Sequence, residues 1–221
     1  MCDSPLRNPP VRVHERSRVQ IRVDIGRCYT TLPGSRTEVL GVAQVLHETR
    51  PGGMTELLLG CEATPSALRA QALNSTLLHI ATHGLVDARR PRLSALALTP
   101  DPSPPDEAAF RLLDILELKL RARLVVLSAC DTSRGRLLPG EGVLGLAQAF
   151  LEAGAESVVA SYWRVEDGAT APFMERLYHH LLVDHLPAAA ALRRTQLDQA
   201  SDANSFAWAA FTLYGGANAS L

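Results

Sequence analysis

Residues 123–129 read RLVVLSA, a stretch that is apolar and rich in β-branched side chains. Such a run is typical of a central strand in a parallel sheet, where both faces of the strand are buried. Helical patterns flank it near 107–117 and at 141–153, and another buried run, SVVASY, follows at 157–162. This alternation predicts an α/β fold, a mostly parallel β-sheet with helices on both faces.

The same alternation extends toward both ends of the chain. Further strands are expected at 19–25, 56–60, 76–81, 95–98 and 207–215, and further helices at 36–48, from Pro65, at 169–182 and at 188–199. Thr64 is placed to cap the helix that begins at Pro65. We expect a basic N-terminal segment over 1–31, either irregular or an extra edge strand, and one α/β domain over 32–221.

The composition is that of an ordinary globular protein. The chain has 221 residues, of which 47% are hydrophobic and 20% charged, and it is long enough to bury one sizeable core without a disulfide or a metal. Residues 1–36 hold seven arginines and three acids, although the net charge of the whole chain is −1. We interpret this basic part as a solvated arm, with contact to an acidic partner as the alternative. The balanced total argues against direct nucleic-acid binding by the whole chain.

Several further classes are disfavoured by the sequence. No apolar run approaches the roughly 20 residues of a membrane span, and the first residues carry no apolar signal segment. The four cysteines, at 2, 28, 61 and 130, form no C-x-x-C pair, which argues against a zinc knuckle and suits a reducing cytoplasm. We therefore expect a cytoplasmic protein without membrane contact, cofactor or metal.

Polar residues follow three of the expected strands, where sites form in open α/β sheets. The segments are Thr82-His83-Gly84, Cys130-Asp131-Thr132 and Trp163 to Asp167. His83 and Cys130 stand at the same end of neighbouring strand units, and a cysteine nucleophile needs a nearby base. The backbone N–H groups of Gly84 and Cys130 would then form an oxyanion hole. Taken singly, His83 or Cys130 is more often structural, since a free cysteine usually behaves as a small buried hydrophobe.

Two motifs resemble those of a known family. LLHIATHG at 77–84 resembles the histidine motif of the CHAT domain family, the caspase-like peptidase domains often found with tetratricopeptide repeats. The block from Arg123 to Leu181 resembles that family's cysteine motif with the helix, strand and loop that follow. Weaker similarity is carried by LPGSRTEV at 32–39, LLLGCEATPSAL at 57–68 and FAWAAFTLYG at 206–215.

The resemblance implies a caspase–haemoglobinase fold and a dyad of Cys130 as nucleophile with His83 as general base or orienter. It further implies a protein substrate, an activating partner or tetratricopeptide-repeat protein, and a role in bacterial regulation or defence. Ser133 stands where the family usually has glycine, and the family's first strand is not recognisable in 1–31. A catalytically silent protein-interaction module on the same fold is the alternative.

A rival glycine pattern lies at Gly140, Gly142 and Gly145, which fits G-x-G-x-x-G by spacing. A dinucleotide fingerprint must follow its strand directly, whereas residues 130–139 intervene here. We interpret the pattern as a loop and a helix start, with glycines for a turn and close packing.

Asp131, Trp163 and Asp167 are the candidate substrate-binding residues. With Glu166, the two aspartates would form an acidic pocket that prefers arginine or lysine before the cleaved bond, although Arg164 lies in the same loop. The alternative for Asp167 is an N-cap of the helix at 169–182.

Three histidines lie on or just after that helix: His179, His180 and His185. Without an acidic or cysteine partner at ligand spacing, they are interpreted as a solvated face and not as metal ligands. Cys28 and Cys61 have no histidine motif beside them and are interpreted as structural.

Overall fold

The computed structural model describes residues 18–23, 32–87, 90–102, 109–131, 141–163, 165, 168–200 and 206–221. In this part of the chain, eight strands form one sheet with the order β2-β1-β3-β6-β7-β8; off this path, β4 pairs with β3 and β5 pairs with β4. The strands are β1 (Arg18–Val23), β2 (Met54–Leu59), β3 (Leu77–Leu85), β4 (Ala95–Ala97), β5 (Ala109–Arg111), β6 (Leu124–Asp131), β7 (Ser157–Ser161) and β8 (Phe211–Gly215). The helices are α1 (Pro33–Thr49), α2 (Pro65–Ala72), α3 (Leu112–Leu116), α4 (Glu141–Glu152), α5 (Thr170–Leu182) and α6 (Ala188–Gln199).

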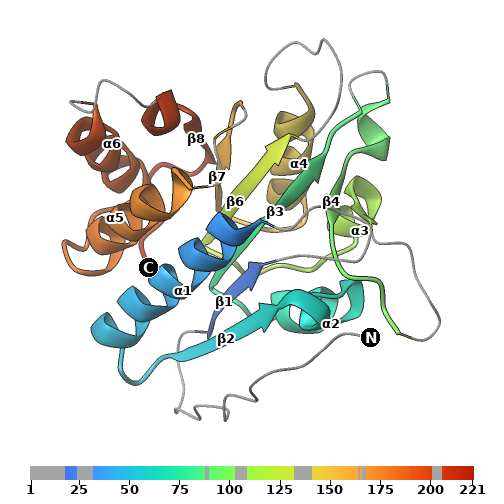
Figure 1. Cartoon of the computed structure of the whole chain (residues 1–221), viewed down its shortest axis with the longest axis horizontal. Coiled ribbons are helices and arrows are strands. Elements are labelled where there is room, and N and C mark those ends of the chain that lie inside the picture. The colour runs from blue at the N-terminus through green and yellow to red at the C-terminus, as the bar shows by residue number, and fades with distance from the viewer. Residues whose placement is uncertain are drawn as a thin grey trace.

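The central ladder of the sheet is parallel. The pairs β2–β1, β1–β3, β3–β6 and β6–β7 all run parallel. The pairs β7–β8, β3–β4 and β4–β5 are antiparallel. The strands β3, β6 and β7 are neighbours in the middle of the sheet, and their carboxyl ends lie side by side along the same edge (Figure 1).

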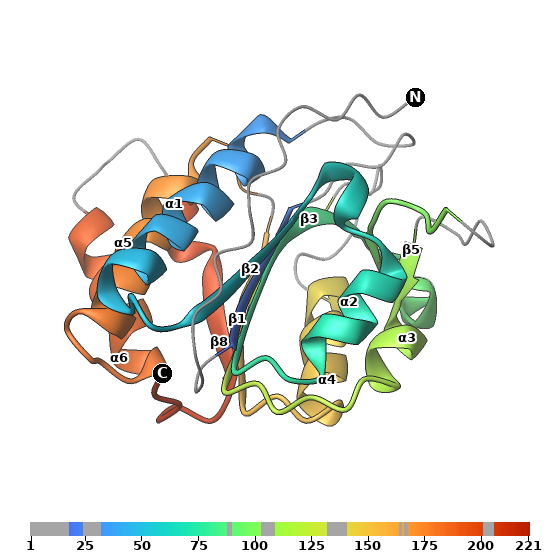
Figure 2. The ribbon, with the colours of Figure 1, turned by 90° about the horizontal axis from the view of Figure 1, so that it is seen from below.

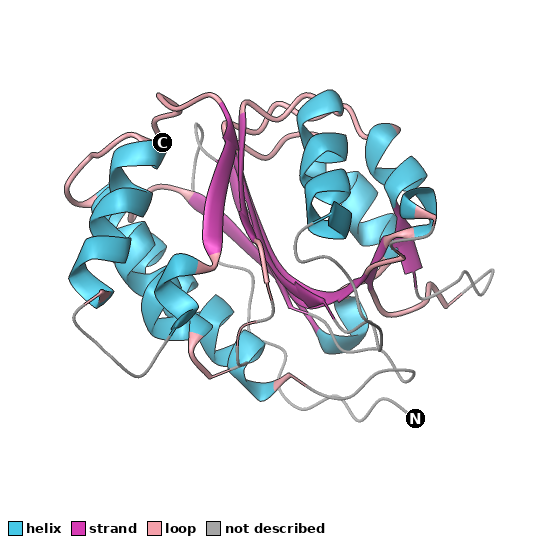
Figure 3. Cartoon of the chain, turned by 90° about the horizontal axis from the view of Figure 1, so that it is seen from above, coloured by secondary structure: helices cyan, strands magenta, loops and turns pink. Residues whose placement is uncertain are grey.

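Helices cover both faces of the sheet. Seen along the sheet, α1, α5 and α6 lie on one face and α2, α3 and α4 on the other (Figures 2 and 3). Each layer encloses its own hydrophobic core. One contains Val39, Phe173, Leu177 and Leu192 of the first helix group, and the other contains Leu68, Ile115, Leu146 and Phe150 of the second. The expected α/β fold class is confirmed.

Local signals fix several element ends as the sequence predicts. Thr64 Oγ1 accepts a hydrogen bond from the N–H of Ala67 at 3.2 Å, so it caps α2, with Pro65 in the first turn. After α4 the chain reverses at Gly154, whose φ of +111° favours glycine. A Cβ added there would lie 2.6 Å from the carbonyl oxygen of Leu120, so the turn also requires a close backbone approach.

Four features differ from the expectations. β1 lies between β2 and β3, so it is an interior strand and not an edge strand. β3 and β6 run on through Gly84 and Asp131, so the polar triplets begin inside the strands and not after them. The helix expected near 107–117 is only Leu112–Leu116, preceded by β5. Finally, Cys61 is disulfide-bonded, where free thiols were expected.

The helices of the described part are too short or too polar to cross a bilayer; none of them qualifies as a membrane span.

Candidate active site

The site rests on the pairing of β3 with β6. In their parallel register His83 is the partner of Cys130, and Gly84 is the partner of Asp131. These are the last pairs of the ladder, so both residues lie at the carboxyl edge of the sheet. Two residues 47 positions apart in sequence are thereby brought to adjacent strands at the same level. Backbone positions at the same level of adjacent strands allow two side chains to lie close together, which a nucleophile and its base would need.

The backbone around His83 is held from the side opposite β6. Beyond the end of β1, Gly84 of β3 pairs with Leu96 of β4. The Thr82 hydroxyl donates a hydrogen bond of 2.7 Å to the carbonyl oxygen of Ala97. His83 itself is buried, with 5% of its surface exposed. The histidine therefore belongs to a strand that is paired on both edges, which restricts its movement.

The backbone of Cys130 is held in a similar way by β7. The Ser161 hydroxyl donates a 3.3 Å hydrogen bond to the carbonyl oxygen of Ala129, the residue before Cys130. Val126, Ser128 and position 130 lie on the same face of β6, because side chains alternate along a strand. Val126 belongs to the core between the sheet and helices α1 and α5. The side chains of Cys130 and Asp131 lie outside what the structure describes, as does Ser133.

Trp163 lies near the same edge. Leu127 of β6 pairs with Ala160 of β7, and three residues further along each segment come Cys130 and Trp163. Trp163 is 37% exposed, and its ring meets the Tyr162 ring edge-on, with centroids 6.3 Å apart. Trp163 therefore presents an apolar surface at the edge of the sheet where His83 and Cys130 lie.

Three charged residues follow Trp163 in the same loop. Asp167, Glu166 and Arg164 all lie outside the described residues. The alternative role of Asp167 as the N-cap of α5 is wrong, because the N-cap residue of that helix is Ala169.

A buried polar network beneath this edge was not anticipated from the sequence. Glu38 of α1 and His79 of β3 are both completely buried. His79 Nε2 lies 2.9 Å from Glu38 Oε1, and its Nδ1 lies 3.0 Å from the Tyr178 hydroxyl of α5. The Ser128 hydroxyl of β6 donates a 3.0 Å hydrogen bond to Glu38 Oε2. Burial first, and then the charge of Glu38, raises the pKa of Tyr178 well above its ordinary value, so this phenol keeps its proton.

One signal for this network was present in the sequence. His79 interrupts an apolar strand, LLHIA, and a titratable side chain there needs a partner. The identity of the partner was not encoded locally, since Glu38 stands 41 residues away and Tyr178 stands 99 residues away.

The family model of the CHAT domain matches residues 16–216, which includes β1 and nearly the whole chain. The chain belongs to the CHAT domain family. Tetratricopeptide repeat protein 28 of Mus musculus is 30% identical over an alignment of 207 residues, and the match covers 73% of this chain and 8% of that protein. Its counterpart from Homo sapiens is 37% identical over 118 residues, 52% of this chain and 5% of that protein. The chain thus spans less than a tenth of the length of these relatives.

Solved structures similar to this CHAT domain are caspase-like peptidases. Separase from Saccharomyces cerevisiae, in complex with securin, has a TM-score of 0.57 and 18% identity, covering 90% of this chain and 12% of that one. The Arg-specific cysteine proteinase gingipain R has a TM-score of 0.60 and 10% identity, and the match covers 93% of this chain and 47% of that one. At these identities the likeness establishes the fold, which is caspase-like.

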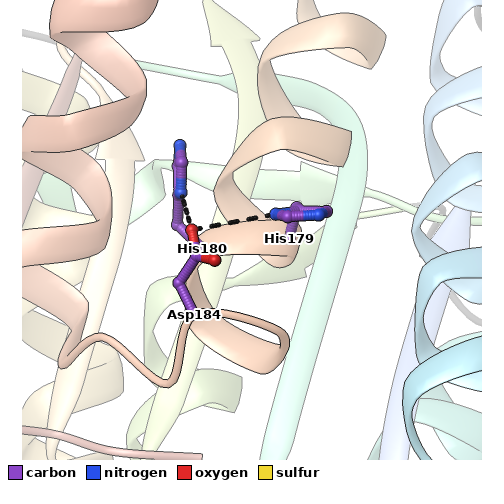
Figure 4. Close-up of side chains that lie close together, drawn as sticks. All are labelled: His179, His180 and Asp184. Atoms are coloured by element: carbon purple, nitrogen blue, oxygen red, sulfur yellow. Dashed lines mark hydrogen bonds and ion pairs between the residues drawn. The ribbon is translucent and has the colours of Figure 1, made fainter.

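The histidines of α5 in the CHAT domain are partly mispredicted. His180 is only 8% exposed, so it does not belong to a solvated face. It does have acidic partners, because its Nδ1 lies 2.6 Å from Asp184 and its Nε2 lies 2.9 Å from Asp198. His179 Nδ1 lies 3.8 Å from the same Asp184 oxygen, so this carboxylate faces both rings (Figure 4).

In the described part of the chain, one group of side chains lies close enough together to share a metal ion: His179, His180 and Asp184. His180 already uses both ring nitrogens on carboxylates, and Asp198 is also paired with Arg194 at 3.1 Å. The side chains therefore form a network that joins α5 to α6, and the geometry fits ion pairing without a metal.

Two glycines of the pattern, Gly142 and Gly145, lie within α4 of the CHAT domain. β6 ends at Asp131 and α4 begins at Glu141, so the pattern does not follow the strand directly. A Cβ added at Gly145 would lie 3.6 Å from Leu112, an ordinary contact. Close packing therefore does not require glycine at 145, contrary to the sequence-based interpretation.

Proposed function

We propose that this CHAT domain is a cysteine endopeptidase in which Cys130 is the nucleophile and His83 the general base. The observation that carries the proposal is the pairing of His83 with Cys130 at the last pairs of two central parallel strands. Membership of the CHAT family and the caspase-like fold support it. Support also comes from the burial of His83, since removal from bulk water strengthens a thiol–imidazole interaction.

The reaction would proceed in two halves. His83 takes the proton of the Cys130 thiol, and the sulfur forms a bond to the carbonyl carbon of the scissile peptide. The N–H groups of Gly84 and Cys130 donate hydrogen bonds to the resulting oxyanion. His83 then gives the proton to the leaving nitrogen, the C–N bond breaks, and a thioester remains. Water, deprotonated by His83, hydrolyses the thioester and releases the second product.

The proposed substrate preference is for arginine or lysine before the cleaved bond. Asp131 adjoins the nucleophile, and Asp167 and Glu166 follow Trp163 in the next loop. A carboxylate in a partly desolvated pocket pairs strongly with a guanidinium. The similar structure of a cysteine proteinase described as Arg-specific agrees with such a pocket on this fold. Asp167 is our first choice for the pocket acid.

Activation by a partner protein forms part of the proposal. Relatives of the chain are named for tetratricopeptide repeats, and the chain matches only a small part of their length. We expect low activity in isolation and higher activity when a repeat protein or substrate is bound. A bacterial regulatory or defence role and a cytoplasmic location stay predictions.

The proposal is tested by labelling with a peptide acyloxymethyl ketone that carries arginine next to the warhead. We expect modification of Cys130, mapped by mass spectrometry, and its loss in His83→Ala. The matched control is Cys2→Ala, which should label like the wild type. A folded chain that remains unlabelled at Cys130, with and without a repeat partner, would favour the alternative, a silent interaction module.

A further inference from the structure

The buried network below the dyad joins four elements: α1, β3 and β6 meet at one carboxylate, and α5 joins through His79. Glu38 of α1 accepts from His79 of β3 through one oxygen and from Ser128 of β6 through the other. Because a carboxylate only accepts, the ring N–H at Nε2 of His79 must point to it. Tyr178 of α5 then engages the other ring nitrogen.

The strands that Glu38 links are the two that carry the dyad. His79 stands four residues before His83 on β3, and Ser128 stands two residues before Cys130 on β6. In a strand, residues separated by two lie on the same face. The network therefore occupies the dyad's face of the sheet, about 7 Å below Cys130 and about 13 Å below His83 along the strands.

Stability alone does not explain this arrangement. The surrounding residues of that face are apolar, among them Leu77, Ala81 and Val126. Burying a carboxylate there carries a desolvation penalty, and apolar replacements of buried ion pairs are often neutral or stabilising. What a carboxylate adds is geometry, because its two oxygens hold two donors at a fixed spacing.

We propose that Glu38 is a positioning residue of the dyad: by joining His79 and Ser128 it fixes how the ends of β3 and β6 lie relative to each other. This inference rests on the proposed peptidase function. A displacement of about 1 Å between reacting groups can cost roughly 100-fold in rate, so a rigid link between the strands matters to the chemistry. The thiol and the imidazole then remain within reach of each other before substrate binds.

The test uses the rate of Cys130 alkylation by iodoacetamide across pH 5–10 in the full chain, with the site mapped by mass spectrometry. The rate follows the thiolate fraction, and an ordinary cysteine thiol has a pKa of about 8.5. In the wild type we expect Cys130 to react at pH values well below this pKa. In His83→Ala we expect the pH profile of an ordinary thiol. If His83→Ala leaves the profile unchanged, the dyad is absent and the proposed function fails.

The inference itself is tested by Glu38→Gln and Ser128→Ala. The Glu38→Gln change would turn an amide N–H₂ toward one of the two donors, and Ser128→Ala removes one donor with little change in shape. Each variant should slow alkylation at pH 6.5 by roughly 10-fold to 100-fold and move the profile toward that of His83→Ala. The matched control is Ser157→Ala, a buried serine at the amino end of β7 that donates to the Gly216 carbonyl. Its profile should stay within about twofold of the wild type.

If both variants keep the wild-type profile while His83→Ala changes it, the inference is wrong and the dyad stands. If Glu38→Gln does not fold, as judged by circular dichroism, Ser128→Ala alone decides. Tyr178→Phe adds a graded readout, because it removes the hydroxyl contact to His79 but leaves both hydrogen bonds to Glu38. Its profile should lie between those of the wild type and Ser128→Ala.

Discussion

The two faces of the sheet are built from the same strands but differ in chemistry. Toward α2, α3 and α4, the strands present apolar side chains such as Ile80, Leu127 and Ala160. Toward α1, α5 and α6, the same strands carry His79 and Ser128 among apolar neighbours. His83 and position 130 continue this second face by strand alternation.

The contrast shows how one sheet separates stability from chemistry. A parallel strand alternates its side chains, so each face can be specified independently at a spacing of two residues. The apolar face packs against its helices through buried hydrophobic side chains. The polar face adds a fixed hydrogen-bond geometry near its carboxyl end, where His83 and Cys130 lie.

The largest effect should come from the dyad on the polar face. Cys130→Ala and His83→Ala should each lower the cleavage rate by about 10⁴-fold or more, because the two groups act as one unit. The double variant should be little worse than either single one. Initial rates on a fluorogenic peptide, with circular dichroism to verify folding, check this. Retained cleavage in Cys130→Ala would exclude it as the nucleophile.

The opposite result is expected on the apolar face. Phe150 of α4 is fully buried, and Phe150→Ala should lower the free energy of unfolding by about 3–5 kcal/mol through lost contacts and a cavity. The pH profile of Cys130 alkylation should not move while the chain is folded. Urea unfolding and alkylation on the same sample separate the two quantities. A shifted profile would mean that the faces are not independent.

A smaller effect concerns the carboxyl edge, where both faces end. Asp167→Asn should weaken an arginine preference roughly 10-fold to 100-fold, the loss expected when one partner of a charged hydrogen bond becomes neutral. A fluorogenic library that varies the residue before the cleaved bond measures this. Best cleavage after aspartate or an apolar residue would contradict the acidic pocket. An unchanged arginine preference would assign the charge to another residue.

The smallest effect concerns the ion pairs between α5 and α6. Hydrogen bonds from His180 hold the pKa values of Asp184 and Asp198 below the ordinary value of 3.8. The charge of Arg194 lowers both pKa values further. His179 adds to the effect at Asp184, and Arg176 adds to it at Asp198. A lowered folded-state pKa means that the carboxylates stabilise the fold above about pH 4, and that this contribution is lost as the pH falls further.

Asp198→Asn should therefore narrow the difference in urea midpoint between pH 7 and pH 3. Asp101→Asn serves as a comparison, because the pKa of Asp101 is also lowered but it lies on the other helix layer, beside Ser66 of α2. It should narrow the same difference by its own contribution, and the effects of the two substitutions should add. It should leave the contribution of the α5–α6 pairs intact. If Asp198→Asn does not change the pH dependence at all, the network contributes nothing to acid stability.

The sequence predicted most of the fold because the relevant signals are local. Apolar runs, the Thr64–Pro65 cap and Gly154 each act within a few residues, so α2, α4 and the core strands were located correctly. The position of β1 was missed, since alternation over 19–25 indicates a half-buried strand but does not say which neighbours will cover its edges. His180 was misjudged only partly for this reason: Asp198 comes from the next helix, but Asp184 stands four residues after His180 and was a local signal.

The sequence by itself determined the chemical inventory of the site: a histidine and a cysteine, each at the end of a buried strand, in motifs specific enough to indicate the family. Only the tertiary structure decided that His83 and Cys130 share a level, and that Glu38, His79, Ser128 and Tyr178 meet beneath them. The physical reason is distance along the chain. Helix and strand periodicity is read within a few residues, whereas these hydrogen bonds join residues 41 to 99 positions apart, and such partners are chosen by the packing of the whole sheet and its helices.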